Sequence, residues 1–449
     1  NCHWRLATKK KVGSRYYKYS EEAKEEVIMN YCWLFNIGIE DNWSVDRFKI
    51  KDLEEDRIVQ HMEEIMLMMA DRDDTLLLRR KPNDTFLCQM RSYGFEVPQI
   101  ICPEKEETTK TITQLVLEDN KVLWELKELS HKKDTYLLPY GVTEDEEILA
   151  KECGMGVIGP DSTVSRVSNS KLYAKELVKK LHLSSPDGKV CENFDQIREE
   201  WDRLRNQFRR IVIKRPYGAS GRGLYLVEDF EKLQKVLYIL KRSGSENEKC
   251  IVEGWYEDKK DLNTQMYICD DGNVKILSVT EQILEDTVYK GSIIPVELPD
   301  DIKSKYLTAL EKAGSKLYRD GIRGIVGIDS IVTEKEVFPI IEINVRFTLS
   351  TYLSMLPLRF PDRYFCSMYY RIFLSEKWNY AEITKKLVRA GLAFDTKTRE
   401  GIFCYNYACV DRDILGKAGR LFVIMIVKQR TDLQKLRFKL EQLLEETKY

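Results

Sequence analysis

Two carboxylates and one amide stand at regular spacing in two neighbouring apolar runs near the end of the third quarter of the chain. Asp329 lies in the first run, and Glu342 and Asn344 lie two residues apart in the second. Residues at i and i+2 of a strand face the same side, and pairing of the two runs would bring Asp329 to them. Such oxygen ligands suit Mg2+, with water and phosphate oxygens completing its shell. The alternative is an amphipathic strand with an ordinary polar face.

A glycine-rich segment between the apolar runs 211–214 and 224–227 is the second candidate. It contains Gly218, Ser220, Gly221 and Gly223. The residues after Gly223 favour a strand, so we predict a β-hairpin; a Walker loop or dinucleotide fingerprint would open a helix instead. Glycines let backbone amides approach anionic oxygens, Ser220 adds a hydroxyl donor, and Lys214 adds positive charge. The segment therefore favours phosphate binding, with a plain glycine-rich hairpin as the alternative.

Composition excludes several classes of function. Lys and Arg number 72 against 73 Asp and Glu, for a net charge of -1, so no overall field attracts nucleic acid or an anionic membrane. The longest apolar runs, such as 421–427, are far shorter than the ~20 residues that a membrane helix needs. We expect neither nucleic acid nor membrane as a partner.

Cysteine and histidine usage narrows the chemistry further. The 11 cysteines stand singly without a Cys-x-x-Cys pair, and the 4 histidines lie far apart. This pattern argues against a zinc site and against most histidine-based catalysis, and it is typical of reduced thiols. We therefore expect a cytoplasmic protein whose chemistry comes from groups other than histidine or a zinc site.

The elements that would position these residues are predicted from apolar periodicity. Residues 1–70 are charged, with helix-period apolar positions that include Tyr31 and Leu34, and we predict a helical N-terminal segment. Residues 71–165 alternate short apolar runs with helical stretches, for example the runs 76–78 and 135–139. This alternation predicts a parallel three-layer α/β domain.

The remainder of the chain divides into two further predicted regions. Residues 166–384 begin with an amphipathic helix near 168–183 and continue as alternating strands and helices, including a smaller subdomain at about 185–255 that carries the glycine-rich loop. Residues 385–449 contain strand-like runs near 402–410 and 421–427 and a charged terminal helix at 431–446, and we predict a small C-terminal α/β element.

The loop Lys-Arg-Pro-Tyr-Gly-Ala-Ser-Gly-Arg-Gly at 214–223, followed about a hundred residues later by Gly-Ile-Asp and then Glu-Ile-Asn, resembles the ATP-grasp superfamily in order, spacing and flanking strands. The ending Glu-Ile-Asn-Val-Arg, the Asn-Ser-Lys at 169–171 and the tail at 391–403 look most like the pheganomycin-type peptide ligases. The core resemblance covers roughly 165–370. It implies a pre-ATP-grasp domain followed by an ATP-grasp core of two α+β subdomains.

The resemblance also implies roles for residues of the nucleotide site. Lys171 and Lys214 match the two lysines that contact phosphates, and Gly218 to Gly223 match the lid over them. Glu253 and its followers Trp255 and Tyr256 resemble the hinge that holds adenine, although core packing is an equal alternative for the two aromatic residues. For ribose we favour Asp261 over Glu257 and Asp258.

At the reacting end, the resemblance makes Asp329, Glu342 and Asn344 the metal-binding triad. It makes Arg346 an arginine near the acyl phosphate or γ-phosphate, acting in catalysis together with Lys214. Thr280, Glu281, Gln282 and residues 289–292 are candidates for the substrate pocket, with a structural role as the alternative.

The implied activity is that of an ATP-dependent carboxylate–amine ligase, which forms an amide or peptide bond through an acyl phosphate and releases ADP and phosphate. The implied cofactors are ATP and Mg2+, with Mn2+ as a substitute, and the substrates are a small-molecule or peptide carboxylate and an amine. Family analogy allows a homodimer. Two alternatives stay open: a catalytically silent, regulatory ATP-binding protein of this fold, and a grasp-type kinase.

Overall fold

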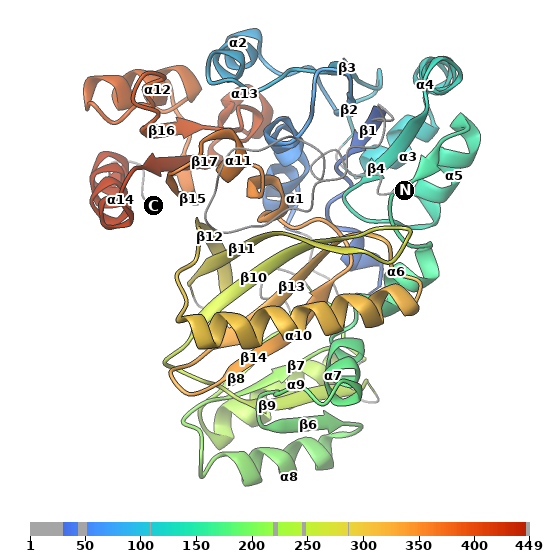
Figure 1. Cartoon of the computed structure of the whole chain (residues 1–449), viewed down its shortest axis with the longest axis vertical. Coiled ribbons are helices and arrows are strands. Elements are labelled where there is room, and N and C mark those ends of the chain that lie inside the picture. Colours follow the sequence, from blue (N-terminus) through green and yellow to red (C-terminus); the bar gives the residue numbers. More distant parts are fainter. Residues whose placement is uncertain are drawn as a thin grey trace.

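The computed structural model describes residues 30–43, 52–107, 109–218, 223–244, 248–285 and 287–445. Their strands form three sheets, of five, eight and four strands (Figure 1). Within these residues, no helix combines the length and the apolar character needed to cross a membrane.

The first sheet is parallel and has the order β3-β2-β1-β4-β5. Its strands are β1 (Asn30–Leu34), β2 (Thr75–Leu77), β3 (Gln99–Ile101), β4 (Thr135–Pro139) and β5 (Gly156–Val157). The helices α3 (Ile112–Leu117), α4 (Asn120–Lys132) and α5 (Glu144–Cys153) cover one face through a core that includes Leu34, Leu137 and Leu149. The other face packs, through Trp33 and Leu138, into the large core shared with the C-terminal elements. This burial on both faces is typical of parallel sheets.

The predicted helical N-terminal segment is wrong at Tyr31 and Leu34. Both residues lie in β1, which pairs with β2 and β4 in the middle of the first sheet. A short apolar run buried on both faces has no period that distinguishes a strand from a helix, which explains the error. Helix is found later in the segment, in α1 (Leu53–Gln60) and the 3-10 helix η3 (His61–Met68). Residues 1–29 lie outside the described residues.

The eight-stranded sheet has the order β14-β13-β10-β11-β12-β15-β17-β16. Its strands are β10 (Lys260–Ile268), β11 (Val274–Glu285), β12 (Val288–Ile294), β13 (Gly324–Val332), β14 (Val337–Asn344), β15 (Tyr364–Phe373), β16 (Gly401–Cys404) and β17 (Ala418–Val427). The helix α10 (Asp300–Arg319) lies across one face (Figure 1), and α7 (Lys171–Lys180) packs beside β14. Leu310, Val326 and Leu177 belong to the core between them.

The four-stranded sheet forms the small subdomain that carries the glycine-rich loop, and its order is β6-β9-β7-β8. Its strands are β6 (Gly188–Cys191), β7 (Ile211–Lys214), β8 (Leu224–Val227) and β9 (Cys250–Gly254), covered by α8 (Phe194–Leu204) and α9 (Phe230–Arg242). β7 and β8 pair antiparallel, from Lys214 opposite Leu224 to Ile211 opposite Val227. The predicted β-hairpin is therefore confirmed.

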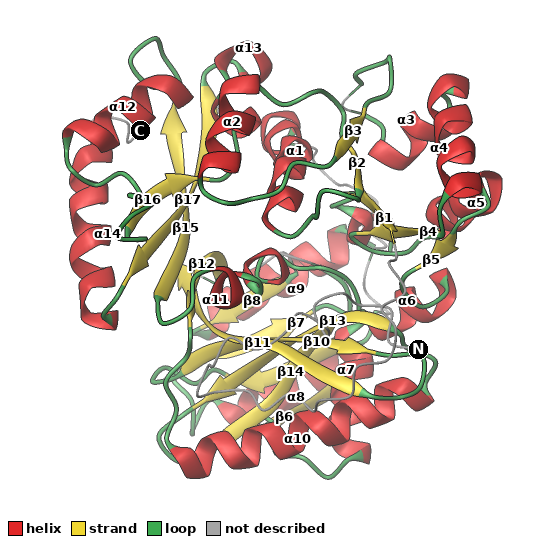
Figure 2. Ribbon diagram, turned by 45° about the horizontal axis from the view of Figure 1, so that its top comes forward, coloured by secondary structure: helices red, strands yellow, loops and turns green. Residues whose placement is uncertain are grey.

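The C-terminal strands extend the eight-stranded sheet. β15 joins β12 to β17, and β17 in turn pairs with β16. Figure 2 shows α14 (Arg430–Leu444) along these strands, with α12 (Tyr380–Arg389) and α13 (Arg412–Leu415) close by. The strand predicted near 402–410 ends at Cys404, and residues 408–410 form the 3-10 helix η5 (Ala408–Val410). This extension brings α1 and η3 against β17 and η5.

Candidate functional site

A cavity of about 920 Å³ is lined by strands of the four- and eight-stranded sheets and by residues that follow strands of the first sheet. The four-stranded sheet contributes Lys214 and Glu253, the eight-stranded sheet contributes Asp329 and Glu342, and Tyr140 follows β4 of the first sheet. This volume is at the upper end of the range of about 300–1,000 Å³ for ligand sites. The cavity is therefore the candidate active site.

The predicted acidic triad comes together on one wall of this cavity. Asp329 and Glu342 are direct partners across the β13–β14 ladder, and Asn344 stands opposite Gly327. The Asn344 amide donates a hydrogen bond to Asp329 Oδ2 at 3.0 Å. The other carboxylate oxygen, Oδ1, accepts from Asn263 Nδ2 at 2.8 Å and Gln282 Nε2 at 3.0 Å. The triad is thus held in place by the neighbouring strands β10 and β11.

The electrostatics of the triad suit a divalent cation. Burial, reinforced by the nearby Glu342 carboxylate, raises the pKa of Asp329 to about 6. A cation between the two carboxylates would relieve this repulsion, and the donor set is all oxygen. The described residues hold no group of three or more His, Cys, Asp or Glu side chains that could bind a metal. A third protein ligand would therefore be the amide oxygen of Asn344, and the residues present fit Mg2+ with phosphate or water oxygens completing the shell.

Lys171 links this triad to the glycine-rich loop. Its Nζ donates to the Gly218 carbonyl at 2.8 Å and pairs with Glu342 Oε1 at 3.1 Å. The side chain is buried at the first turn of α7. Of the loop residues predicted to bind phosphate, Gly218 lines the cavity and Gly223 closes the hairpin, whereas Ser220 and Gly221 lie outside the described residues. The structure therefore brings Lys171, Gly218 and the triad together.

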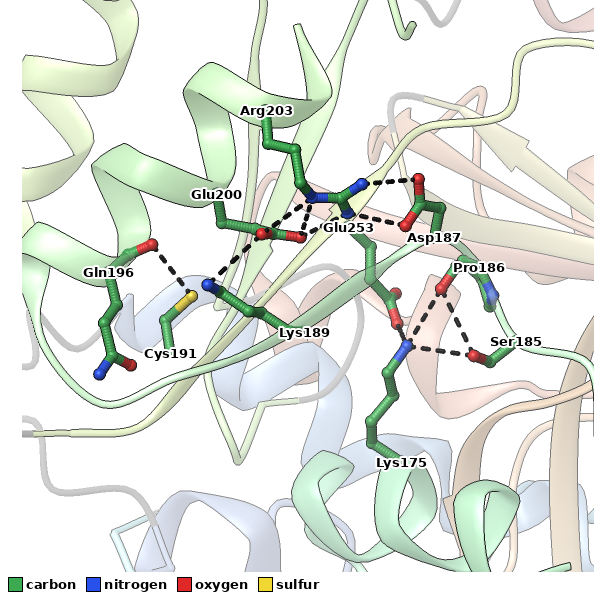
Figure 3. Close-up of polar contacts among 10 residues, drawn as sticks. All are labelled: Lys175, Ser185, Pro186, Asp187, Lys189, Cys191, Gln196, Glu200, Arg203 and Glu253. Atoms are coloured by element: carbon green, nitrogen blue, oxygen red, sulfur yellow. Dashed lines mark hydrogen bonds and ion pairs between the residues drawn. The ribbon is translucent and has the colours of Figure 1, made fainter. Parts of the chain in front are cut away.

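Glu253 holds two lysines at once. Its Oε2 lies 2.6 Å from Lys214 Nζ, and its Oε1 lies 2.7 Å from Lys175 Nζ. Figure 3 shows Lys175 reaching this carboxylate, with Ser185 and Pro186 as further acceptors. Burial alone would raise the pKa of Glu253, but the two ammonium groups outweigh it and hold the pKa below its usual value.

Lys175 was missed by sequence reasoning. It lies four residues after Lys171, so both lysines occupy the same face of α7. That spacing was the available signal. Lys175 is not among the residues that line the cavity, and it acts on the site through its ion pair with Glu253.

Trp255 and Tyr256, the residues predicted to form the adenine hinge, line the cavity together with Gly254. The backbone amide of Trp255 donates to the Arg210 carbonyl at 2.9 Å, and its ring lies 4.4 Å from Lys259 Nζ. The Tyr256 ring contacts Phe208 and Phe338, with centroid distances of 5.3 and 4.9 Å. Tyr256 therefore combines core packing with a position on the cavity wall.

Three acids compete for the predicted ribose position. Asp261 lines the cavity, and Lys259 forms an ion pair with it. Glu257 instead pairs with Arg210, and neither Glu257 nor Asp258 is among the lining residues. Burial lowers the pKa of Lys259. The geometry therefore favours Asp261, as the sequence analysis did.

Arg346 is buried at the boundary with the first sheet. Its Nε lies 2.7 Å from Glu40 Oε1, and its Nη1 donates to the Tyr140 hydroxyl at 3.0 Å. Burial alone would lower the pKa of Arg346, but Glu40 and Tyr140 outweigh it and raise the pKa. Glu40 lies in the 3-10 helix η2 (Ile39–Asn42). No local pattern predicts a partner so distant in sequence, and Glu40 was missed for that reason.

Two regions of the chain match known protein families. Residues 190–344 match the family described as L-aspartate–L-methionine ligase, ATP grasp. Residues 62–155 match the pre-ATP-grasp domain. The chain belongs to the ATP-grasp superfamily and carries a pre-ATP-grasp domain. The fold class predicted from the sequence is therefore confirmed, and strands β2, β3 and β4 of the five-stranded parallel sheet lie within the residues that match the pre-ATP-grasp domain.

Among curated relatives, the [butirosin acyl-carrier protein]–L-glutamate ligase of Niallia circulans is 28% identical over 339 residues, which cover 74% of this chain and 75% of that protein. The phosphoribosylamine–glycine ligase of Caldanaerobacter subterraneus is 25% identical over 224 residues, which cover 46% of this chain and 51% of that protein.

Solved structures show the likeness in fold. Biotin carboxylase from Campylobacter jejuni aligns with a TM-score of 0.58 at 12% identity, covering 92% of this chain and 90% of that one. Phosphoribosylamine–glycine ligase from Thermotoga maritima aligns with a TM-score of 0.54 at 14% identity, covering 94% and 99%.

Proposed function

We propose that this protein is an ATP-dependent ligase that joins a carboxylic acid to an amine and releases ADP and phosphate. The observation that carries the proposal is the meeting of Lys171 with Glu342 and Asp329 on one wall of the cavity, beside the lid residue Gly218. Lysine and metal-bound carboxylates are the groups that neutralise and orient the phosphates of a nucleotide. Membership of the ATP-grasp superfamily supports the same function.

The nucleotide would occupy the cleft between the four- and eight-stranded sheets. Trp255 and Tyr256 would contact the base, Asp261 the ribose, and Lys171 and Lys214 the phosphates. Asp329, Glu342 and Asn344 would hold Mg2+, or Mn2+ as a substitute, and the ion would offset negative charge on the phosphate oxygens. The lid loop at 218–223 would exclude water from the reacting groups.

The reaction proceeds in two displacements. An oxygen of the substrate carboxylate bonds to the γ-phosphorus of ATP while the bond from that phosphorus to the bridging oxygen breaks, so ADP leaves and an acyl phosphate forms. The amine nitrogen then bonds to the acyl carbon, phosphate leaves with the electron pair of the broken C–O bond, and the proton of the amine passes to solvent. Arg346 supports both steps, because its Nη2 makes no hydrogen bond to the described residues while Nε and Nη1 are anchored.

An amino acid is the best candidate for one of the substrates. The matching family and the relatives are named for L-aspartate with L-methionine, for L-glutamate, and for glycine. We infer an amino-acid or peptide product. A cytoplasmic location and a homodimer stay predictions from the cysteine pattern and from family analogy.

The test is release of ADP and phosphate from MgATP across pairs of amino acids, with the condensed product identified by mass spectrometry. Glu342→Gln removes a triad carboxylate, and Glu334→Gln, an exposed acid in the turn after β13, is the matched control. We expect a product with wild type and the control and none with Glu342→Gln. Tight ATP binding without turnover on any pair would instead favour a regulatory ATP-binding protein, and a phosphorylated product without amide would favour a kinase.

A further inference from the structure

The cavity has a second group of charged residues that the nucleotide and the metal triad do not use. Glu55 of α1, Arg371 and Tyr369 of β15, and Arg420 of β17 all line it. These elements lie outside residues 190–344, the part that matches the ligase family. One continuous cavity therefore joins the phosphate-binding wall to a distinct charged end.

The two arginines share one carboxylate. Arg371 Nη2 lies 2.7 Å from Glu55 Oε2, and Arg420 Nη2 forms an ion pair with Glu55 Oε1. The Arg420 guanidinium lies over the Tyr369 ring, 4.6 Å from its centroid. Contacts with Glu55 and Tyr369 thus orient the Arg420 side chain. The ion pair with Glu55 also places the Arg371 guanidinium beside that of Arg420.

Arg420 is left with unused donors. The residue is 7% exposed, its Nη1 has only the Met62 sulfur at 3.8 Å, and its Nε has no hydrogen-bond partner among the described residues. A buried guanidinium with unmade hydrogen bonds is costly. The planar fork of an arginine matches a carboxylate in two-pronged geometry. Arg420 Nε itself is closed to the cavity, so the donors open to a ligand are those of Arg371, whose side chain is 69% exposed and bonds only through Nη2 among the described residues. Two guanidinium groups that share one carboxylate are therefore complementary to a second anionic group that enters from the cavity.

We infer that Arg420 and Arg371 bind a substrate carboxylate that stays free throughout the reaction. This inference rests on the proposed ligase function, because the other end of the cavity would hold the carboxylate that is activated. The free carboxylate has two sources: the second carboxylate of an acidic donor such as aspartate or glutamate, or the α-carboxylate of an amino-acid acceptor. In both cases the arginines select amino-acid substrates over simple monocarboxylic acids and amines.

The test compares wild type with Arg371→Gln. The Arg371 side chain is 69% exposed, so its replacement leaves the fold intact. Arg389→Gln is the control, since it removes the same charge from an exposed position of α12. ADP release is measured with aspartate and glutamate against their two monoamides as donors, and with amino acids against their amides as acceptors. The donor and acceptor arms distinguish the two sources of carboxylate.

In either the donor arm or the acceptor arm, we expect the wild-type KM to be about ten- to a hundred-fold lower for the substrate with the free carboxylate than for its amide. A charge-assisted hydrogen bond accounts for a difference of this size. Arg371→Gln should abolish this preference while the KM for ATP and the Tm match those of Arg389→Gln. Arg420→Lys, which keeps the charge without the fork, should weaken the preference in the same arm. Equal behaviour of Arg371→Gln and Arg389→Gln in both arms would overturn the inference.

A failure of the ligase function itself is recognised separately. If wild type makes no product on any pair, calorimetric titration of aspartate and glutamate is carried out with a non-hydrolysable MgATP analogue bound. Binding that Arg371→Gln weakens and Arg389→Gln does not would support the carboxylate site without the ligase. Absence of any binding by wild type would overturn it.

Discussion

Arg346 and Glu40 form a buried ion pair, 2.7 Å from Nε to Oε1, that joins the segment after β14 to the segment after β1. Both side chains are at most 9% exposed. The Phe347 amide donates to the Tyr140 carbonyl at 2.7 Å beside them. An arginine proposed to act on the γ-phosphate is thus positioned by the domain that precedes the core.

Glu40→Ala tests this link. Removing one partner of a buried pair leaves an uncompensated charge, so we expect the free energy of unfolding to fall by about 3–5 kcal/mol, together with a fall in kcat. Glu96→Ala, which removes the acid of the surface pair with Arg72, should cost less than about 1 kcal/mol. Urea unfolding measures both. The link has no special role if the two variants unfold at the same urea concentration.

The metal triad predicts a strict dependence on divalent cations. Chelation with EDTA should abolish ADP release, and Mg2+ or Mn2+ should restore it, because the proposed phosphate site relies on two carboxylates and an amide. Asp329→Asn removes one of these charges and should raise the Mg2+ concentration for half-maximal activity about tenfold or more. This concentration is measured by following ADP release as a function of Mg2+ concentration for wild type and Asp329→Asn. Undiminished activity in EDTA would rule out the triad as a metal site.

The sequence predicted the parts of the site that local spacing encodes. Glu342 and Asn344 share a face because they are two apart, and Asp329 joins them because β13 and β14 are consecutive strands. Glu40 and Arg420 could not be found in this way. They meet Arg346 and Glu55 only after distant segments of the chain pack together.

The prediction of secondary structure failed at β1 because of burial that the local sequence pattern does not encode. The side chains of β1 are all buried, so neither a two-residue nor a 3.6-residue period marks it. The β7–β8 hairpin was predictable because glycines punctuate two apolar runs, and the helix α7 because its apolar positions keep a helical spacing. Elements such as β1, whose burial depends on contacts between distant segments, could not be predicted from the local sequence.

The ion pairs of Glu253 should make the stability of the four-stranded subdomain depend on pH. The folded pKa of Glu253 is lowered, because Lys214 and Lys175 outweigh burial. Its ion pairs therefore contribute fully above the ordinary glutamate pKa of about 4.3, and the contribution is lost as the pH falls toward the lowered value. Glu253→Gln should cost about 3 kcal/mol at pH 7, and this cost should shrink below about pH 4.5.

Urea unfolding of wild type and Glu253→Gln at pH 7 and pH 4 gives the difference in the free energy of unfolding at each pH. Glu192→Gln is the control, because it removes an exposed glutamate that pairs with Lys249, and we expect no comparable loss from it at either pH. A cost for Glu253→Gln that stays constant across the range would contradict the assignment of its charge.

Gly223 ends the lid loop in a backbone conformation that favours glycine, with φ of +75°. A Cβ added there would lie 3.0 Å from the Tyr217 carbonyl oxygen and 3.3 Å from Arg215 Cβ. Gly154 also has a positive φ, +67°, in the left-handed helical region, and a Cβ there would meet only Ser130 Oγ at 3.7 Å, an ordinary contact, so Gly154→Ala carries the backbone strain alone, about 1–2 kcal/mol. Gly223→Ala should lose more stability than Gly154→Ala and should also raise the KM for ATP, because the chain at Tyr217 and Arg215, next to the proposed phosphate site, would have to shift. Calorimetric unfolding and ATP titration measure the two effects; equal losses and an unchanged KM would mean that the conformation of Gly223 does not shape the lid.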